Sequence, residues 1–85
     1  MKNYYIIKLV YPDNKIYYLT FLNIEKYNDG TPNVEWSMSP EENYAMKFNS
    51  MDMAQNICGI LNLSLIDFNI NGKAIIIYKS DTFNE

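Results

Sequence analysis

The chain has 85 residues, of which 48% are hydrophobic and 15% aromatic, and its formal net charge is −3. This length and composition predict one small globular domain with a single core. There is no histidine, all seven basic residues are lysines, and Cys58 is the only cysteine. These counts exclude imidazole catalysis, arginine clamping of phosphates, a disulfide framework and a zinc site built from cysteine and histidine. We therefore expect no cofactor and no metal.

Charge and hydropathy also restrict the partners. The acidic pI of about 4.7 and the scattered lysines argue against binding to duplex nucleic acid, which requires clustered cations. No stretch approaches 18 apolar residues, and Lys8 interrupts the apolar run near the N-terminus. We expect no membrane contact and a reducing, cytoplasmic location.

The first predicted element is a β-hairpin. Residues 4–10 and 15–22 are rich in tyrosine, isoleucine and leucine, and they flank a Pro12-Asp13-Asn14 turn. A three-residue loop sets the register. It pairs Leu9 with Tyr17, Ile7 with Leu19 and Tyr5 with Phe21 on one face, and Val10 with Ile16, Lys8 with Tyr18, Ile6 with Thr20 and Tyr4 with Leu22 on the other.

A loop at 25–32 is predicted to lead to a third strand near 33–38, where apolar and polar residues alternate. A capping box beginning at Ser39 predicts a short helical turn at about 40–44. Ser50 is a suitable N-cap for the main helix at about 51–61. The apolar stripe of this helix follows the i, i+3, i+4, i+7 pattern at Ala54, Ile57, Cys58 and Leu61.

Residues 64–70 and 73–79 flank Asn71-Gly72, a strong two-residue hairpin signal. The predicted register pairs Phe68 with Ile75 and Ile66 with Ile77 on the core face. The resulting fold is α+β: an antiparallel sheet of about five strands (two hairpins plus one strand), with one main helix. The expected domain covers residues 1–80, and residues 81–85 form a frayed tail.

The second face of this sheet is unusually apolar. A helix of about 16 Å shields only part of one face. The assigned register leaves nine large side chains opposite the core: Tyr4, Ile6, Val10, Ile16, Tyr18, Leu22, Leu65, Ile76 and Tyr78. Three explanations stay open: the chain's own loops and short helical turn cover this face, a second copy or another protein covers it, or a one-residue register slip exchanges the faces.

If a partner covers that face, the predicted protein-binding residues are Tyr4, Ile6, Tyr18, Leu22, Ile76 and Tyr78. The many tyrosines also raise the alternative of base stacking by a weak single-strand nucleic-acid binder, although Lys8 is the only cation expected there.

No catalytic residues are predicted. Cys58 lies on the helical stripe and is expected to be a core residue, since no imidazole is present to activate it. A carboxylate pair formed by Glu35 with Glu41 or Asp67 has no supporting spacing rule. Asn28-Asp29-Gly30 lacks the alternating acidic ligands of a calcium loop and is interpreted as a turn.

The stretch Ala-Met-Lys-Phe-Asn-Ser-Met-Asp-Met-Ala at 45–54 resembles a pattern in small phage and prophage proteins of low-GC Gram-positive bacteria. The resemblance implies a protein in the host bacterial cytoplasm that binds and blocks a host protein, such as a CRISPR or other defence component. It carries over no site residue. The leading hypothesis is a non-enzymatic protein-binding domain, the alternatives being a small structural or regulatory homodimer and a single-strand nucleic-acid binder.

Overall fold

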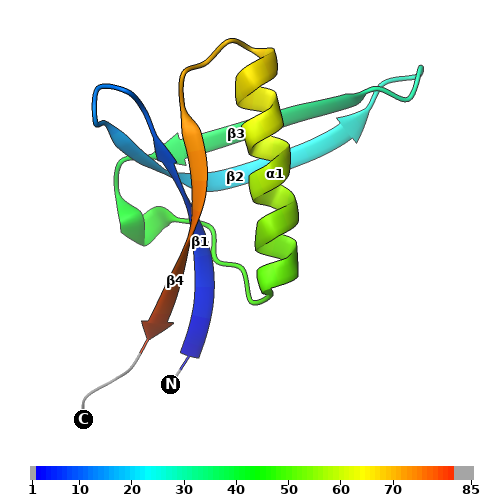
Figure 1. Ribbon diagram of the computed structural model, residues 1–85. Helices are drawn as coiled ribbons and strands as arrows, with labels where there is room; N and C mark the ends of the chain where they lie inside the picture. Colours follow the sequence, from blue (N-terminus) through cyan, green and yellow to red (C-terminus); the bar gives the residue numbers. More distant parts are fainter. Residues whose placement is uncertain (1, 82–85) are drawn as a thin grey trace.

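The computed structural model describes residues 2–81, which form a four-stranded antiparallel sheet with one α-helix packed against it (Figure 1). The strand order is β3-β2-β1-β4. The elements are β1 (Lys2–Val10), β2 (Ile16–Lys26), β3 (Pro32–Ser39), the 3-10 turn η1 (Glu42–Tyr44), α1 (Met51–Asp67) and β4 (Lys73–Asp81). The predicted α+β class is confirmed, with four strands instead of about five. Of the predicted tail, Asp81 belongs to β4, and residues 82–85 lie outside the described residues.

The first hairpin is confirmed, including its register at the turn. Asn14 adopts a left-handed φ of 67°, and the Tyr11 amide donates to the Lys15 carbonyl at 3.0 Å. The predicted pairs Lys8–Tyr18, Leu9–Tyr17 and Val10–Ile16 form, and the pairing of β1 with β2 stops there. Beyond this point Tyr5 exchanges two 2.8 Å hydrogen bonds with Phe48, so the predicted pairing of Tyr5 with Phe21 is wrong.

β2 and β3 form a long ribbon that projects beyond the rest of the sheet (Figure 1). The third strand lies where it is predicted, and the connecting turn is shorter than expected because β2 continues to Lys26. Gly30 closes this turn with a φ of 88°. The Asp29 carboxylate accepts hydrogen bonds from the Thr31 amide at 3.0 Å and from its hydroxyl at 2.6 Å. A register shift between Leu19 and Phe21 changes which β2 side chains face the helix.

The helix begins where it is predicted, with the Ser50 hydroxyl accepting a hydrogen bond from the Met53 amide. It then continues to Asp67, so the predicted strand at 64–70 and the hairpin at Asn71-Gly72 are wrong. Ser64 and Leu65 extend the buried stripe by a further turn. The helix ends in a Schellman motif, in which Asn69 is left-handed (φ 57°) and the Ile70 amide donates to the Leu65 carbonyl at 2.8 Å.

β4 therefore pairs with β1 instead of with its predicted neighbour. The register places Ile76 opposite Ile7 and Tyr78 opposite Tyr5. Because Ile7 belongs to the core beneath α1, Ile76 and Tyr78 lie on the helix side of the sheet. Ile75 and Ile77, predicted for the core face, lie on the opposite side, which we call the far side.

The core fills the space between α1 and the middle of the sheet. Its buried side chains come from three strands, the helix and the segment before the helix: Ile7, Leu9, Leu19, Phe48, Ala54, Cys58, Leu61, Leu65 and Ala74. Tyr5, Leu22, Trp36, Ile57 and Ile76 pack around this cluster and are partly exposed. The projecting ribbon and one flank of the helix thus extend past the core.

Candidate protein-binding surface

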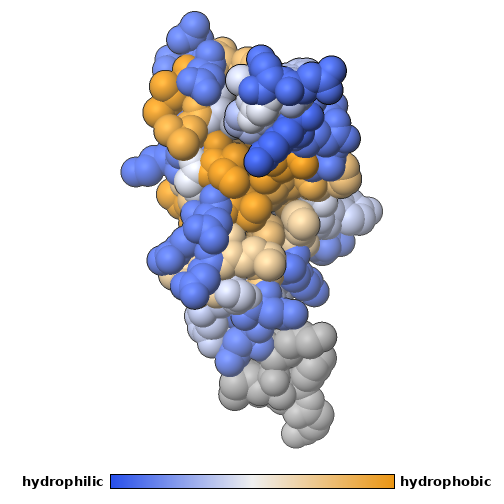
Figure 2. All heavy atoms as spheres, turned by 90° about the vertical axis from the view of Figure 1, so that its right-hand side faces the viewer, coloured by the Kyte–Doolittle hydropathy of each residue, from blue (hydrophilic) through white to orange (hydrophobic). Residues whose placement is uncertain are grey.

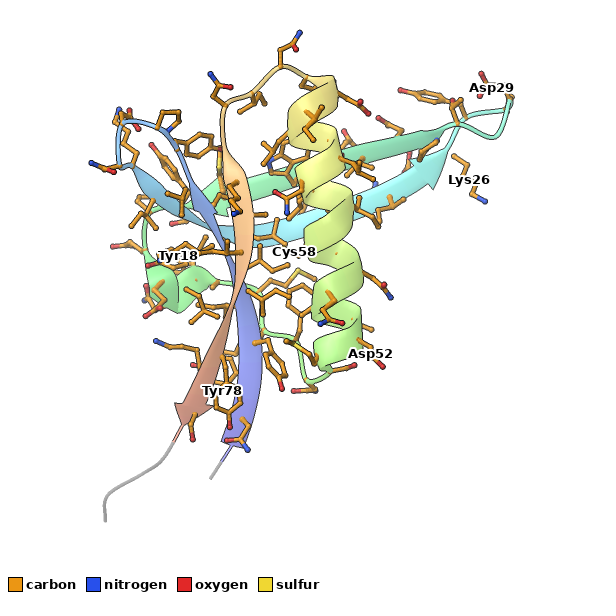
Figure 3. The ribbon with its side chains drawn as sticks, in the orientation of Figure 1. Tyr18, Lys26, Asp29, Asp52, Cys58 and Tyr78 are labelled. Carbon is orange, nitrogen blue, oxygen red and sulfur yellow. The ribbon has the colours of Figure 1, made fainter. Side chains whose placement is uncertain are left out.

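The six residues predicted to form one binding surface lie on two different sides of the sheet. Tyr4, Ile6 and Tyr18 are on the far side, as predicted. Leu22, Ile76 and Tyr78 are on the helix side, because of the β2 register shift and the true pairing of β4. Figure 3 shows Tyr18 and Tyr78 well separated from one another. These six residues therefore do not make one surface.

The chain's own η1 segment partly covers the far side. Ile6 is only 1% exposed, and a hollow of about 340 Å³ beside it is lined by Tyr4, Ile6, Glu42, Asn43 and Lys47. The Lys79 ammonium contacts the Glu42 carboxylate at 3.1 Å, and the Lys47 ammonium lies 4.8 Å from the centre of the Tyr4 ring. Of the three explanations for the apolar second face, coverage by the chain's own short helical turn therefore accounts for the burial of Ile6.

The far side is also more basic than predicted. Lys73 and Lys79 point to the same side as Lys8, because they lie opposite Val10 and Tyr4 in the register. Hydrogen bonding to Glu42 raises the pKa of Lys79, as does the charge of that carboxylate. Lys8 is therefore not the only cation on the far side, because the predicted hairpin had assigned the β4 side chains to the wrong faces.

A larger exposed apolar surface lies on the helix side, along the projecting ribbon. Leu22 is paired with Trp36, and Ile24 with Val34, so these four side chains form two adjacent rows on one face. Leu22 and Trp36 reach the core, whereas Ile24, farther out, is 42% exposed. The ribbon thus continues the apolar core outward into solvent.

One flank of α1 faces these two rows. At 100° per residue, Met53, Ile57 and Ile60 lie along the same flank of the helix, next to the buried stripe. Ile57 packs against the core with Trp36, and the rings of Trp36 and Phe68 lie 6.1 Å apart, which fixes this flank toward the ribbon. Met53 is 56% exposed and Phe68 is 63% exposed.

We call this surface the helix–ribbon face and define it by seven side chains: Ile24, Val34, Trp36, Met53, Ile57, Ile60 and Phe68. Figure 2, with the ribbon directed toward the viewer, shows a continuous apolar area in the middle of the molecule, bordered by hydrophilic side chains. None of the seven is among the predicted site residues. The alternation of Val34 and Trp36 with polar residues was the available signal. The false strand at 64–70 hid Phe68, and the β2 register shift hid the side to which Ile24 points.

The charges around the helix–ribbon face are unevenly distributed. α1 contains two charged residues, Asp52 and Asp67, one in each terminal turn, and it contains no basic residue. Lys26 and Asp29 lie at the outer end of the ribbon, away from the helix (Figure 3). The helix border of this face is therefore acidic, whereas Lys26, which faces the same side of β2 as Ile24, adds a positive charge at the outer end of the ribbon.

Two further titratable side chains, Cys58 and Asp29, have hydrogen-bond partners within the chain. Cys58 points from α1 into the core, its thiol donates to the Ala74 carbonyl at 3.2 Å, and burial raises its pKa (Figure 3). Hydrogen bonds from Thr31 lower the pKa of Asp29. Within residues 2–81 there is no group of three or more side chains that could hold a metal ion. No helix in that range is long and apolar enough to cross a membrane.

No protein-family model matches the chain, and no curated protein or solved structure is significantly similar to it.

Proposed function

We propose that this chain is a non-enzymatic protein-binding domain that docks its helix–ribbon face on an apolar, basic-rimmed surface of another protein. The observation that carries the proposal is the exposure of large apolar side chains on one face, with Ile24, Met53 and Phe68 each at least 42% exposed. Contiguous apolar surface of this kind is typical of protein interfaces, and Trp and Phe are common energetic anchors in them.

The charges at the border of the helix–ribbon face indicate which kind of partner would bind there. A second copy bound through the same face would bring two helices together that each carry Asp52 and Asp67 and no basic residue. A different protein with lysine or arginine around an apolar centre complements this border and gains association rate from it. The resemblance of residues 45–54 to phage and prophage proteins adds a source for that partner, a bacterial host protein, and a role as its inhibitor or modulator.

Two matched variants test the proposal. Ile24 and Ile16 are both in β2 and are 42% and 40% exposed, but Ile24 is on the helix side and Ile16 on the far side. The immobilised full chain is incubated with bacterial lysate, and the retained proteins are identified by mass spectrometry. We expect Ile24→Glu to lose a protein that the parent chain and Ile16→Glu both retain. Retention by both variants alike, or by neither the parent nor a variant, contradicts the proposal.

A second candidate function is weak binding of single-stranded nucleic acid on the far side. Three lysines, Lys8, Lys73 and Lys79, share that side with Tyr4 and Tyr18, and lysines beside aromatic rings are the components of such sites. Fluorescence anisotropy with a labelled oligonucleotide at low salt tests it. Binding that weakens in Lys8→Glu supports this function, and no anisotropy change at high micromolar protein eliminates it.

A further inference from the structure

The hydrogen bonds of β1 determine which backbone N–H and C=O groups of β4 point outward from the edge of the sheet. Tyr5 uses both its N–H and its C=O on Phe48, so both groups point away from β4. Tyr78 lies opposite Tyr5, and the two residues therefore form a pair without mutual backbone hydrogen bonds. It follows that the N–H and C=O of Tyr78 point outward from the sheet. The same holds at every second residue: Ala74, Ile76 and Ser80.

Asn62 occupies one end of this edge. Its side-chain amide accepts a hydrogen bond from the Ala74 N–H at 2.8 Å and donates to the Ala74 C=O at 3.1 Å, as a neighbouring strand would. β4 is the last strand in the sheet order. The outward-pointing residues beyond the reach of Asn62 are thus Ile76, Tyr78 and Ser80, a short template for a further strand.

We propose that a second copy of this chain adds its own β4 antiparallel to this edge, with Tyr78 paired with Tyr78 of the second copy on a two-fold axis. This pairing matches Ile76 with Ser80 in both directions, so the three outward-pointing residues of each chain all find partners. The interface is separate from the helix–ribbon face and does not depend on the proposed binding of another protein.

Two side chains exclude the neighbouring registers. Moving the two-fold axis to Ile77 would require the Ala74 backbone groups, which Asn62 already holds. Moving it to Lys79 would set two lysine side chains directly opposite one another, which is unfavourable. Centred on Tyr78, the pairing places Lys79 opposite Ile77, and Glu42 balances the charge of each Lys79 within its own chain.

The aromatic side chains support self-pairing over an unrelated strand. The rings of Tyr5 and Tyr78 lie 5.4 Å apart on the helix side, and Tyr78 is 55% exposed. Across the two-fold axis the Tyr78 rings become direct cross-strand neighbours, so the pair extends into a row of four tyrosines over four strands. A row of this kind buries the exposed faces of both Tyr78 rings.

The symmetry has a consequence for the helix–ribbon face. A two-fold axis that relates antiparallel edge strands runs normal to the sheet, so both helices lie on the same side of the resulting eight-stranded sheet. The dimer then presents two copies of the helix–ribbon face in one direction, which suits a partner with two binding sites.

Analytical ultracentrifugation of the full chain, from micromolar to millimolar concentration, tests the proposal. We expect reversible conversion from the 10.0 kDa monomer to a species of twice that mass. Tyr78→Pro removes an outward N–H that β1 does not use, so it should keep the circular dichroism spectrum and lose the dimer. Tyr78→Phe keeps both the backbone donor and the ring, and it should still dimerise. A chain that stays monomeric throughout, or a folded Tyr78→Pro variant that still dimerises, overturns the proposal.

Cross-linking reports the register even if the proline variant fails to fold. A directly opposed backbone pair has Cα atoms about 5.5 Å apart, within the range that a disulfide bridges. With diamide as oxidant, two thiols lose two protons and two electrons, and Tyr78→Cys should give a covalent dimer on a non-reducing gel. Ile76→Cys is the matched control, because its counterpart lies about 13 Å away along the strand. Equal cross-linking of both variants, or none at position 78, contradicts the register.

Discussion

Replacing Asn62 with alanine tests how α1 is attached to β4. The substitution removes both amide hydrogen bonds to Ala74, at 2.8 and 3.1 Å. Ala74 is 2% exposed, so its N–H is left buried without a partner, whereas its carbonyl keeps the Cys58 thiol as a donor. An unsatisfied buried donor costs about 1 to 3 kcal/mol. The higher helix propensity of alanine returns about 0.5 kcal/mol.

We therefore expect Asn62→Ala to lower the free energy of unfolding by about 0.5 to 2.5 kcal/mol, a large share of the stability of a small domain. Urea titration followed by circular dichroism measures it. Asn56→Ala is the matched control, since Asn56 is exposed on the same helix and should show only the small propensity gain. Equal stability of the two variants would refute the attachment of α1 to β4 through Asn62.

Three further predictions concern the helix cap, the β4 loop and the ion pair. Ser50→Ala removes the N-cap oxygen and should destabilise the fold by about 1 kcal/mol in urea titration; unchanged stability would contradict the cap. Gly72→Ala places a Cβ 2.9 Å from the Tyr11 ring, so we expect a loss of about 1 to 2 kcal/mol and a displaced Tyr11 ring signal in NMR spectra; a native spectrum would argue against this contact. Because Glu42 raises the pKa of Lys79 above its ordinary 10.5, the pair stabilises the fold fully below that pH and loses its effect as the pH rises through the raised pKa. Urea midpoints across that range should fall less in Glu42→Gln than in the parent, and parallel curves would contradict the pairing.

Local signals in the sequence predicted the first half of the fold. The Pro12-Asp13-Asn14 turn fixed the hairpin register because Asn14 tolerates the left-handed φ that the loop requires. Ser50 marked the start of the helix because its hydroxyl caps the first turn. The third strand followed from the alternation of Val34 and Trp36 with polar residues.

The second half of the fold failed at one ambiguous segment. Residues 61–65 read Leu-Asn-Leu-Ser-Leu, which satisfies a period of two as well as a helical stripe through Leu61 and Leu65. Tertiary packing against β1 and β4 favours the helix, and Asn69 ends it. Asn71-Gly72 then lies in a loop that leads back to β1, a non-local pairing that no turn signal encodes.

The candidate site was missed because of this segment and because of the β2 register shift. Assigning 64–70 to a strand placed Ile76 and Tyr78 on the wrong side of the sheet and ended the helix before its C-terminal turns. The helix–ribbon face depends on two features. The β2 register shift directs Leu22 and Ile24 toward the helix. The full length of α1 brings Phe68 beside Trp36. Both are consequences of tertiary packing.

An NMR titration tests the central claim most directly. The ¹⁵N-labelled chain is titrated with the protein that the parent chain retains and Ile24→Glu does not, and the shifted backbone amides are mapped. The account predicts that the shifts concentrate at 22–26, 34–36, 53–60 and Phe68, around the helix–ribbon face. Shifts concentrated instead around Tyr4 and Tyr18 on the far side would contradict it.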